Sequence, residues 1–302
     1  MRGVLVQTSA KVNLCLRVLG RRSDGFHEVE TVLHTVDLWD RVYLYPVPEA
    51  GGITLEVNSG EAPADESNLC WRAASVLAKR TNTKLGAAIR LEKSIPAGAG
   101  LGGGSSDAAA TLVGLARIWE LDLQSAALGE LGAELGADVP FFLKGGCCLA
   151  RGKGERLEVC SGVSACLVVV VPEHRVPTAQ AYAALGRGVS RGRRRGMTRA
   201  VQRLLRAVQQ SDLAALGKAL HNDFEAAGMA GIVKGLEAKD DLIEAGCLGA
   251  SLSGSGSAVF GVAPDRETAG QVAEQLRDRW SWVRVASTVP AGRNLLVSDA
   301  EG

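Results

Sequence analysis

The sequence predicts an α+β protein built from two domains. Its first third alternates apolar and polar residues, as antiparallel strands with one buried face do. A glycine cluster then precedes a long apolar pattern of helical period. From residue 163 onward, helical patterns alternate with short apolar segments, which favours helices packed on one small sheet. At 302 residues, the chain is long enough to form two hydrophobic cores.

The β-rich part begins with a strictly alternating segment over residues 11–18. Its two faces separate apolar residues from mostly polar ones: Val12, Leu14, Leu16 and Val18 against Lys11, Asn13, Cys15 and Arg17. Lys11 and Asn13 should therefore point the same way. A second strand is predicted from about residue 27 to 37, and shorter ones near 42–44 and 53–57.

A helix and a strand lead into the glycine cluster, and a longer helix follows it. The first helix is predicted from about residue 67 and the strand over residues 87–91. Because hydroxyl and carboxylate oxygens accept hydrogen bonds from the first amides of a helix, we expect Ser105, Ser106 or Asp107 to cap the longer helix.

Asp138 follows a shorter helix that is predicted to begin at Ser125 and end at Gly136. Because the ring of Pro140 biases Val139 away from helical conformation, the Asp138 carboxylate should lie in a turn at a helix exit. Taken alone, an aspartate in such a turn most often makes local hydrogen bonds.

The pattern changes around residues 160–164, which predicts domains over residues 1–162 and 163–302. Strands in the second domain are expected over 167–171, 250–252, 258–262 and 282–286, and helices near 178–185, 199–209, 212–225, 231–245 and 265–279.

Five glycines lie within seven residues at 98–104. Ordering them costs about 3–5 kcal/mol at roughly 0.5–1 kcal/mol each, which a plain connector would not require. A loop of free amides that leads into a helix start is a good anion site, so phosphate is the expected ligand. A tight turn of small residues is the alternative. The spacing of Gly98, Gly100 and Gly103, with Glu120 or Asp122 further on, also fits a dinucleotide fingerprint.

The composition excludes several classes of protein. The net charge is +1, so no overall field attracts nucleic acid or membrane. The longest apolar run, 165–171, is too short to span a bilayer, and we expect a cytoplasmic protein without a metal site of its own. Residues 186–196 hold five arginines, which favours a solvated loop; alternatives are a lid over a polyanionic substrate or an RNA-binding segment.

Four stretches, in the same order along the chain, resemble the GHMP kinases. The first is similar to their ATP-binding loop: Pro96, Ala97, Gly98, Ala99, Gly100, Leu101, Gly102, Gly103, Gly104, Ser105 and Ser106. The others are residues 10–14 with 22–27, 136–141, and 251–258. The inserted pair Gly103 and Gly104 resembles one branch, the 4-diphosphocytidyl-2-C-methyl-D-erythritol kinases of non-mevalonate isoprenoid synthesis. The resemblance implies an N-terminal domain like domain 2 of ribosomal protein S5 and a ferredoxin-like C-terminal domain.

The resemblance also implies roles at the reacting end of the site. ATP with Mg²⁺ would phosphorylate the 2-hydroxyl of a small cytidyl diphosphate substrate. Asp138 matches the catalytic aspartate, which accepts the hydroxyl proton. Lys11 matches the lysine beside it, and Asn13 would orient the substrate.

The cytosine end is implied by a second group of residues. Phe26 and His27 match the pair that holds the base, with Phe26 in place of the usual tyrosine. Tyr182 would close the other side of the base. Gly254 and Ser255 would contact the substrate from the second domain. Another GHMP kinase, of mevalonate or homoserine type, is the nearest alternative, and the oligomeric state is left undetermined.

Overall fold

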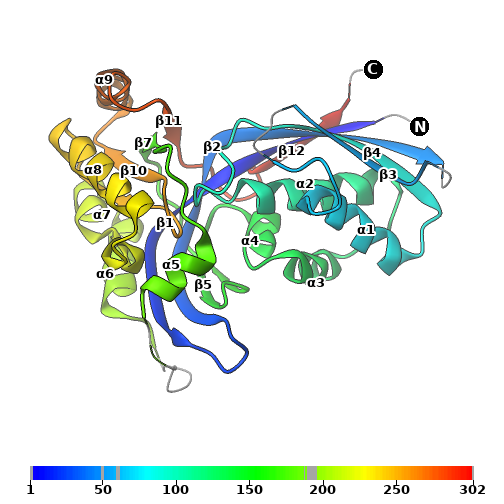
Figure 1. The fold of residues 1–302 in the computed structure, drawn as a ribbon, viewed down its shortest axis with the longest axis horizontal. Coiled ribbons are helices and arrows are strands. Elements are labelled where there is room, and N and C mark those ends of the chain that lie inside the picture. The colour runs from blue at the N-terminus through cyan, green and yellow to red at the C-terminus, as the bar shows by residue number, and fades with distance from the viewer. Residues whose placement is uncertain (1–2, 49–50, 59–61, 187, 189–195, 301–302) are drawn as a thin grey trace.

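The computed structural model describes residues 3–48, 51–58, 62–186, 188 and 196–300. Two sheets, each covered by its own helices, lie side by side along the long axis of the molecule (Figure 1). None of the helices in these ranges is long and apolar enough to cross a membrane.

The larger sheet has eight strands, and its two longest, β1 and β2, pair antiparallel over most of their length. Its strands are β1 (Val4–Arg21), β2 (His27–Pro48), β3 (Ile53–Val57), β4 (Leu85–Glu92), β5 (Cys147–Gly152), β6 (Arg156–Val159), β8 (His221–Asn222) and β12 (Leu295–Asp299). The two segments predicted at 27–37 and 42–44 thus form one continuous strand. Register shifts at Ser9/Ala10, Asn13/Cys15 and Val18/Gly20 interrupt the β1–β2 ladder, and such bulges bend a strand.

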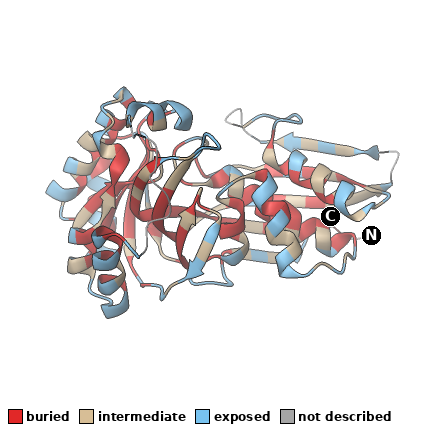
Figure 2. Ribbon diagram, turned by 90° about the horizontal axis from the view of Figure 1, so that it is seen from below, coloured by how far each residue is buried: buried red, intermediate tan, exposed pale blue. Residues whose placement is uncertain are grey.

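Four helices belong to this part of the fold: α1 (Leu69–Thr81), α2 (Gly103–Ile118), α3 (Ser125–Leu135) and α4 (Val139–Lys144). The first two contact the strands, and α3 and α4 pack mainly against each other and against α1 and α2. The α2 helix lies directly against β1 and β2. A Cβ at Gly114 would approach Leu44 Cδ1 to 2.2 Å, so glycine allows this close contact. Burial is concentrated on the strands and on the inward helix faces (Figure 2).

The smaller sheet is antiparallel in the order β11-β7-β10-β9, from β7 (Cys166–Val170), β9 (Gly249–Leu252), β10 (Val259–Ala263) and β11 (Val283–Ser287). Its helices are α5 (Thr178–Ala184), α6 (Arg199–Gln210), α7 (Leu213–Ala219), α8 (Ala230–Glu244) and α9 (Arg266–Leu276). The chain order of strands and helices within this sheet is that of a ferredoxin-like fold, which confirms the predicted α+β class.

Two features of the second half differ from the prediction. The helix expected over 212–225 ends at Ala219, because the next residues pair as β8 with Cys15 and Leu16 of β1 and then form a short 3₁₀ helix, Asp223–Ala226. The last strand, β12, was not predicted and returns to pair with β1 in the larger sheet. The boundary at residue 162 stays a prediction, and β12 lies in the sheet of the first part.

Candidate active site

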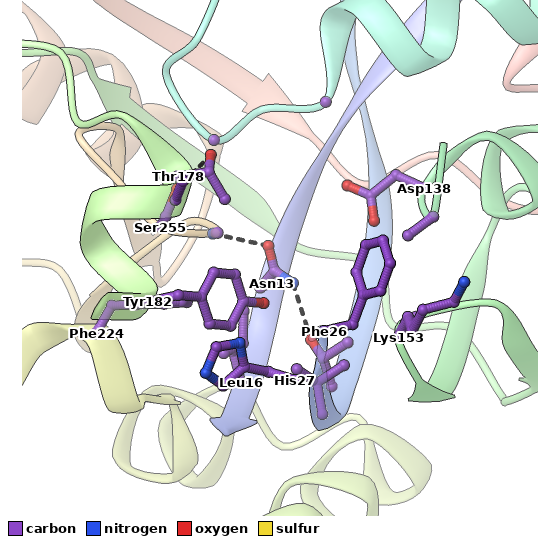
Figure 3. A pocket seen from close by; sticks show the side chains of 18 of the residues that line it. Asn13, Leu16, Phe26, His27, Asp138, Lys153, Thr178, Tyr182, Phe224 and Ser255 are labelled. Atoms are coloured by element: carbon purple, nitrogen blue, oxygen red, sulfur yellow. Dashed lines mark hydrogen bonds between the residues drawn. The ribbon is translucent and has the colours of Figure 1, made fainter. Parts of the chain in front are cut away.

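A cavity of about 1130 Å³ lies where the two parts of the fold meet. It is lined by the glycine loop, β1, the β1–β2 turn, α5 and the turn between β9 and β10. All eight single residues predicted for catalysis or substrate binding line it: Lys11, Asn13, Phe26, His27, Asp138, Tyr182, Gly254 and Ser255. Figure 3 shows most of these side chains around one space.

The glycine loop contributes about half of its predicted residues to the cavity surface, namely Gly98, Gly100, Gly102, Gly103, Gly104 and Ser105. The others, Pro96, Ala97, Ala99, Leu101 and Ser106, do not line it; Ala99 and Leu101 pack in the core. Gly100 has φ +88°, and a Cβ there would lie 2.1 Å from the Ser253 carbonyl oxygen. The loop therefore needs glycine at this position.

The predicted side-chain cap of α2 is wrong. The helix begins at Gly103 after Gly102, with no capping hydrogen bond from a side chain. The Ser106 hydroxyl instead donates to the Ser9 carbonyl oxygen at 2.7 Å, and Asp107 accepts from Lys93 at 2.7 Å. Without a capping side chain, the first amides of the helix can bind an anion from the cavity.

Lys11 lies at the centre of the polar end. Its ammonium group donates to Asn13 Oδ1 at 2.6 Å and to the Gly100 carbonyl oxygen at 2.7 Å, and lies 4.0 Å from Asp138 Oδ2. Burial lowers the pKa of the Lys11 ammonium, and the charge of Asp138 opposes that shift. The predicted common direction of Lys11 and Asn13 is confirmed, since both meet in the cavity.

Asp138 lies between the end of α3 and the start of α4. The expectation that Val139 avoids helical conformation is wrong. Val139 and Pro140 are the first residues of α4. Proline is tolerated there because the first helical amides have no partner within the helix. The Asp138 side chain remains 37% exposed, toward the cavity.

Aromatic side chains form a second group in the same cavity, which we call its aromatic end. The His27 and Tyr182 rings stack at 4.5 Å, and Tyr182 meets Phe224 edge to face at 4.8 Å. Burial, and to a smaller extent Arg21, lowers the pKa of the His27 imidazole. Burial and the charge of Asp138 raise the pKa of the Tyr182 hydroxyl to about 12. Both rings are therefore uncharged at neutral pH.

Comparison with known proteins identifies the family. Residues 68–146 match the GHMP kinases N terminal domain, and residues 204–281 match the GHMP kinases C terminal domain. A 4-diphosphocytidyl-2-C-methyl-D-erythritol kinase from Pelotomaculum thermopropionicum is 44% identical over 89% of this chain and 92% of its own. The chain belongs to this kinase family. Another such kinase, from Symbiobacterium thermophilum, is 40% identical over 92% of this chain and 98% of its own.

Solved structures agree with the family assignment. A crystal structure of a 4-(cytidine 5'-diphospho)-2C-methyl-D-erythritol kinase superposes with a TM-score of 0.78 at 35% identity, covering 94% of this chain and 98% of its own. A homoserine kinase from Cytophaga hutchinsonii shares the fold at 19% identity, with a TM-score of 0.72 over 99% and 98% of the two chains. A kinase of this family uses ATP, so the dinucleotide interpretation of the glycine loop is wrong.

Several residues of this kinase's cavity were not predicted from sequence, among them Arg21, Lys153, Thr178 and Phe224. Thr178 forms a hydrogen bond with Ser255 at 3.1 Å between the two hydroxyl oxygens. The glycines on both sides of Lys153 indicate a turn in the sequence, but not that this turn lies at the cavity. The arginines of segment 186–196 lie outside the described residues.

A buried ion cluster lies beneath the glycine loop. The Lys93 ammonium contacts carboxylates of Asp40 and Asp107, and all three side chains are at most 4% exposed. Asp40 Oδ1 also accepts from the amides of Ser94 and Ile95 at 2.6 and 2.8 Å. The cluster thus joins the two ends of the loop to each other and to β2.

Proposed function

We propose that this kinase transfers the γ-phosphoryl group of ATP to the 2-hydroxyl of 4-diphosphocytidyl-2-C-methyl-D-erythritol, in the non-mevalonate isoprenoid pathway. The observation that carries the proposal is one cavity containing an uncapped helix start, a lysine and aspartate pair, and an aromatic group. Phosphoryl transfer depends mainly on positioning and electrostatics, which these three features can supply together.

The glycine loop would hold the triphosphate. Its positive-φ glycines expose backbone amides, and the start of α2 adds the positive end of the helix dipole. No group of three or more histidine, cysteine or acidic side chains suited to a metal occurs among the described residues. Mg²⁺ would therefore be held mainly by phosphate oxygens, where it neutralises the charge of the transferred group. Ser105, which lines the cavity, would be its protein neighbour, since the Ser106 hydroxyl is taken by Ser9.

Asp138 would accept the proton of the acceptor hydroxyl as that oxygen attacks phosphorus. Lys11, 4.0 Å from this carboxylate, would hold it in position and attract the γ-phosphate oxygens. Asn13 is held by Lys11, by the Thr31 hydroxyl and by the amide of Gly254, so its amide group is fixed beside the acceptor site.

The aromatic end would bind the cytosine. An exposed Phe26 ring offers a face for stacking, and a neutral His27 offers one donor and one acceptor to the edge of the base. Tyr182 would close the site from α5. Gly254 and Ser255 would meet the substrate between the two ends.

A substrate panel tests this function. Purified kinase with ATP and Mg²⁺ is given the cytidyl alcohol, the same alcohol without the cytidyl group, mevalonate or homoserine, and ADP release is measured. Of these four acceptors, we expect only the cytidyl alcohol to be phosphorylated. Faster turnover of mevalonate or homoserine would contradict the proposal.

A further inference from the structure

Lys153 lies in the turn between β5 and β6, next to the aromatic end of the cavity (Figure 3). Glycines on both sides adopt positive φ, +78° at Gly152 and +119° at Gly154. The Lys153 amide donates to the Glu155 carboxylate at 2.5 Å. The Lys153 ammonium lies 4.6 Å from the centroid of the Phe26 ring, so it covers one face of that ring.

The charge of Lys153 has no close carboxylate among the described residues. The Asp24 carboxylate is paired with Arg22 at 3.1 Å, which lowers the pKa of Asp24, and the charge of Lys153 contributes only slightly to that shift. Lysine and arginine line the described cavity at three positions, namely Lys11, Arg21 and Lys153. Lys11 is already engaged with Asn13, Gly100 and Asp138. Within the described part of the chain, Lys153 is therefore a cation at the edge of the substrate cavity for which no ion pair is formed.

The Lys153 turn also reaches the reacting end. A Cβ at Gly154 would lie 3.9 Å from Asp138 Oδ1 and 3.6 Å from Ala137 Cβ, so this backbone abuts the proposed base. A substrate with its base on Phe26 and its hydroxyl at Asp138 must pass its connecting group along this turn. In a nucleoside diphosphate ester, that connecting group is the anionic diphosphate.

We propose that Lys153 binds the diphosphate of the substrate while its alkyl chain and ammonium support the Phe26 ring. This inference rests on the proposed function. A lysine ammonium binds phosphate as a point charge. The contact of the Lys153 ammonium with the Phe26 ring fixes the position of that charge. Lys153 would thereby select substrates that carry a phosphate linker between base and alcohol.

Lys153 could act by binding the diphosphate or by supporting the Phe26 ring. Comparing inhibition by cytidine with inhibition by cytidine 5'-diphosphate distinguishes these two roles. We compare the wild type with Lys153→Met, Lys153→Arg and the control Lys144→Met, whose exposed lysine does not line the cavity. In Lys153→Met, we expect about tenfold weaker inhibition by the diphosphate and less than about twofold change for cytidine, as for one lost charge-assisted contact. Lys153→Arg should recover most of that loss, and KM for ATP should stay unchanged.

Two outcomes would overturn the inference. Equal weakening of cytidine and the diphosphate would show that Lys153 acts through the ring alone, and no change in either would show that it has no part in binding. Circular dichroism of each variant checks that it is folded. The proposed function is tested separately, because it fails only when the wild type does not phosphorylate the cytidyl alcohol.

Discussion

Lys11 is the side chain on which the polar end of the cavity depends most. It is 3% exposed, yet its ammonium reaches an amide oxygen, a loop carbonyl and a carboxylate from three different elements. Burying a charge is costly unless it is paired and hydrogen-bonded. The position is thus maintained by contacts that also hold Asn13 and the loop in place.

Asp138→Asn should retain ATP binding and lose at least about 100-fold in kcat. Asparagine keeps the shape of the side chain but cannot accept the hydroxyl proton, and general bases contribute about 10²–10⁴-fold. Single-turnover kinetics and ATP titration check the two parts. A normal kcat in Asp138→Asn would show that the carboxylate is not the base.

The pH profile of kcat/KM should fall on its alkaline side below pH 10.5, the ordinary pKa of lysine. Burial lowers the pKa of Lys11, so the ammonium loses its proton, and its hold on phosphate, at a lower pH than an exposed lysine would. In Lys11→Arg, the side chain stays charged at alkaline pH, so the profile should lack this alkaline fall even if kcat/KM is lower at every pH. An unchanged alkaline limb in Lys11→Arg would contradict the assignment.

Site residues were predictable from sequence where a short pattern fixes direction. The strict alternation over residues 11–18 correctly placed Lys11 and Asn13 on one face, even though a register shift follows Asn13. Lys153 and Thr178 could not be found this way, since their place in the cavity depends on how β5 and α5 pack against distant strands. Their roles follow from tertiary structure.

The buried ion cluster beneath the glycine loop holds the two ends of the loop together. Lys93 lies just before the loop and Asp107 just after it, and their contact closes the loop at its base. Burial raises the pKa of the Asp107 carboxyl to about 7, against the opposing charge of Lys93. From the sequence, Asp107 was one of three residues expected to cap the helix, because the lysine 14 positions earlier gives no local signal.

Lys93→Met should lower the free energy of unfolding by about 3–5 kcal/mol, because it leaves two carboxylates buried without their cation. KM for ATP should rise more than kcat falls, since the loop loses the contact that joins its ends. Urea unfolding and steady-state kinetics measure the two effects. In the matched control Lys79→Met, an exposed lysine of α1, the change should stay below about 1 kcal/mol. Equal losses in both variants would contradict the role of the cluster.

Two features join distant parts of the chain: the long pairing of β1 with β2, and the pairing of the last strand, β12, with β1. Helix types and most strand positions were predictable, because each has its own apolar period. The pairing of β12 with β1 was not, because a partly exposed strand of five residues far along the sequence carries little pattern. Its effect is to cover the edge of β1, the strand that carries Lys11 and Asn13.

A chain ending at Asn294 should be less stable than one ending at Ala300. It loses five cross-strand pairs with β1, worth about 1–5 kcal/mol in total at roughly 0.2–1 kcal/mol each. It also exposes an edge that can pair between molecules. Thermal unfolding and light scattering compare the two chains. Identical midpoints would show that β12 does not support the sheet.

In the proposed reaction, the glycine loop and Asp138 face the two reactants across one cavity. A crystal structure with a non-hydrolysable ATP analogue and the cytidyl alcohol tests it most directly. We predict the triphosphate on the amides of residues 98–105 and the acceptor hydroxyl within about 2.6–3.2 Å of an Asp138 oxygen. A triphosphate bound elsewhere, or a hydroxyl out of reach of Asp138, would contradict the account.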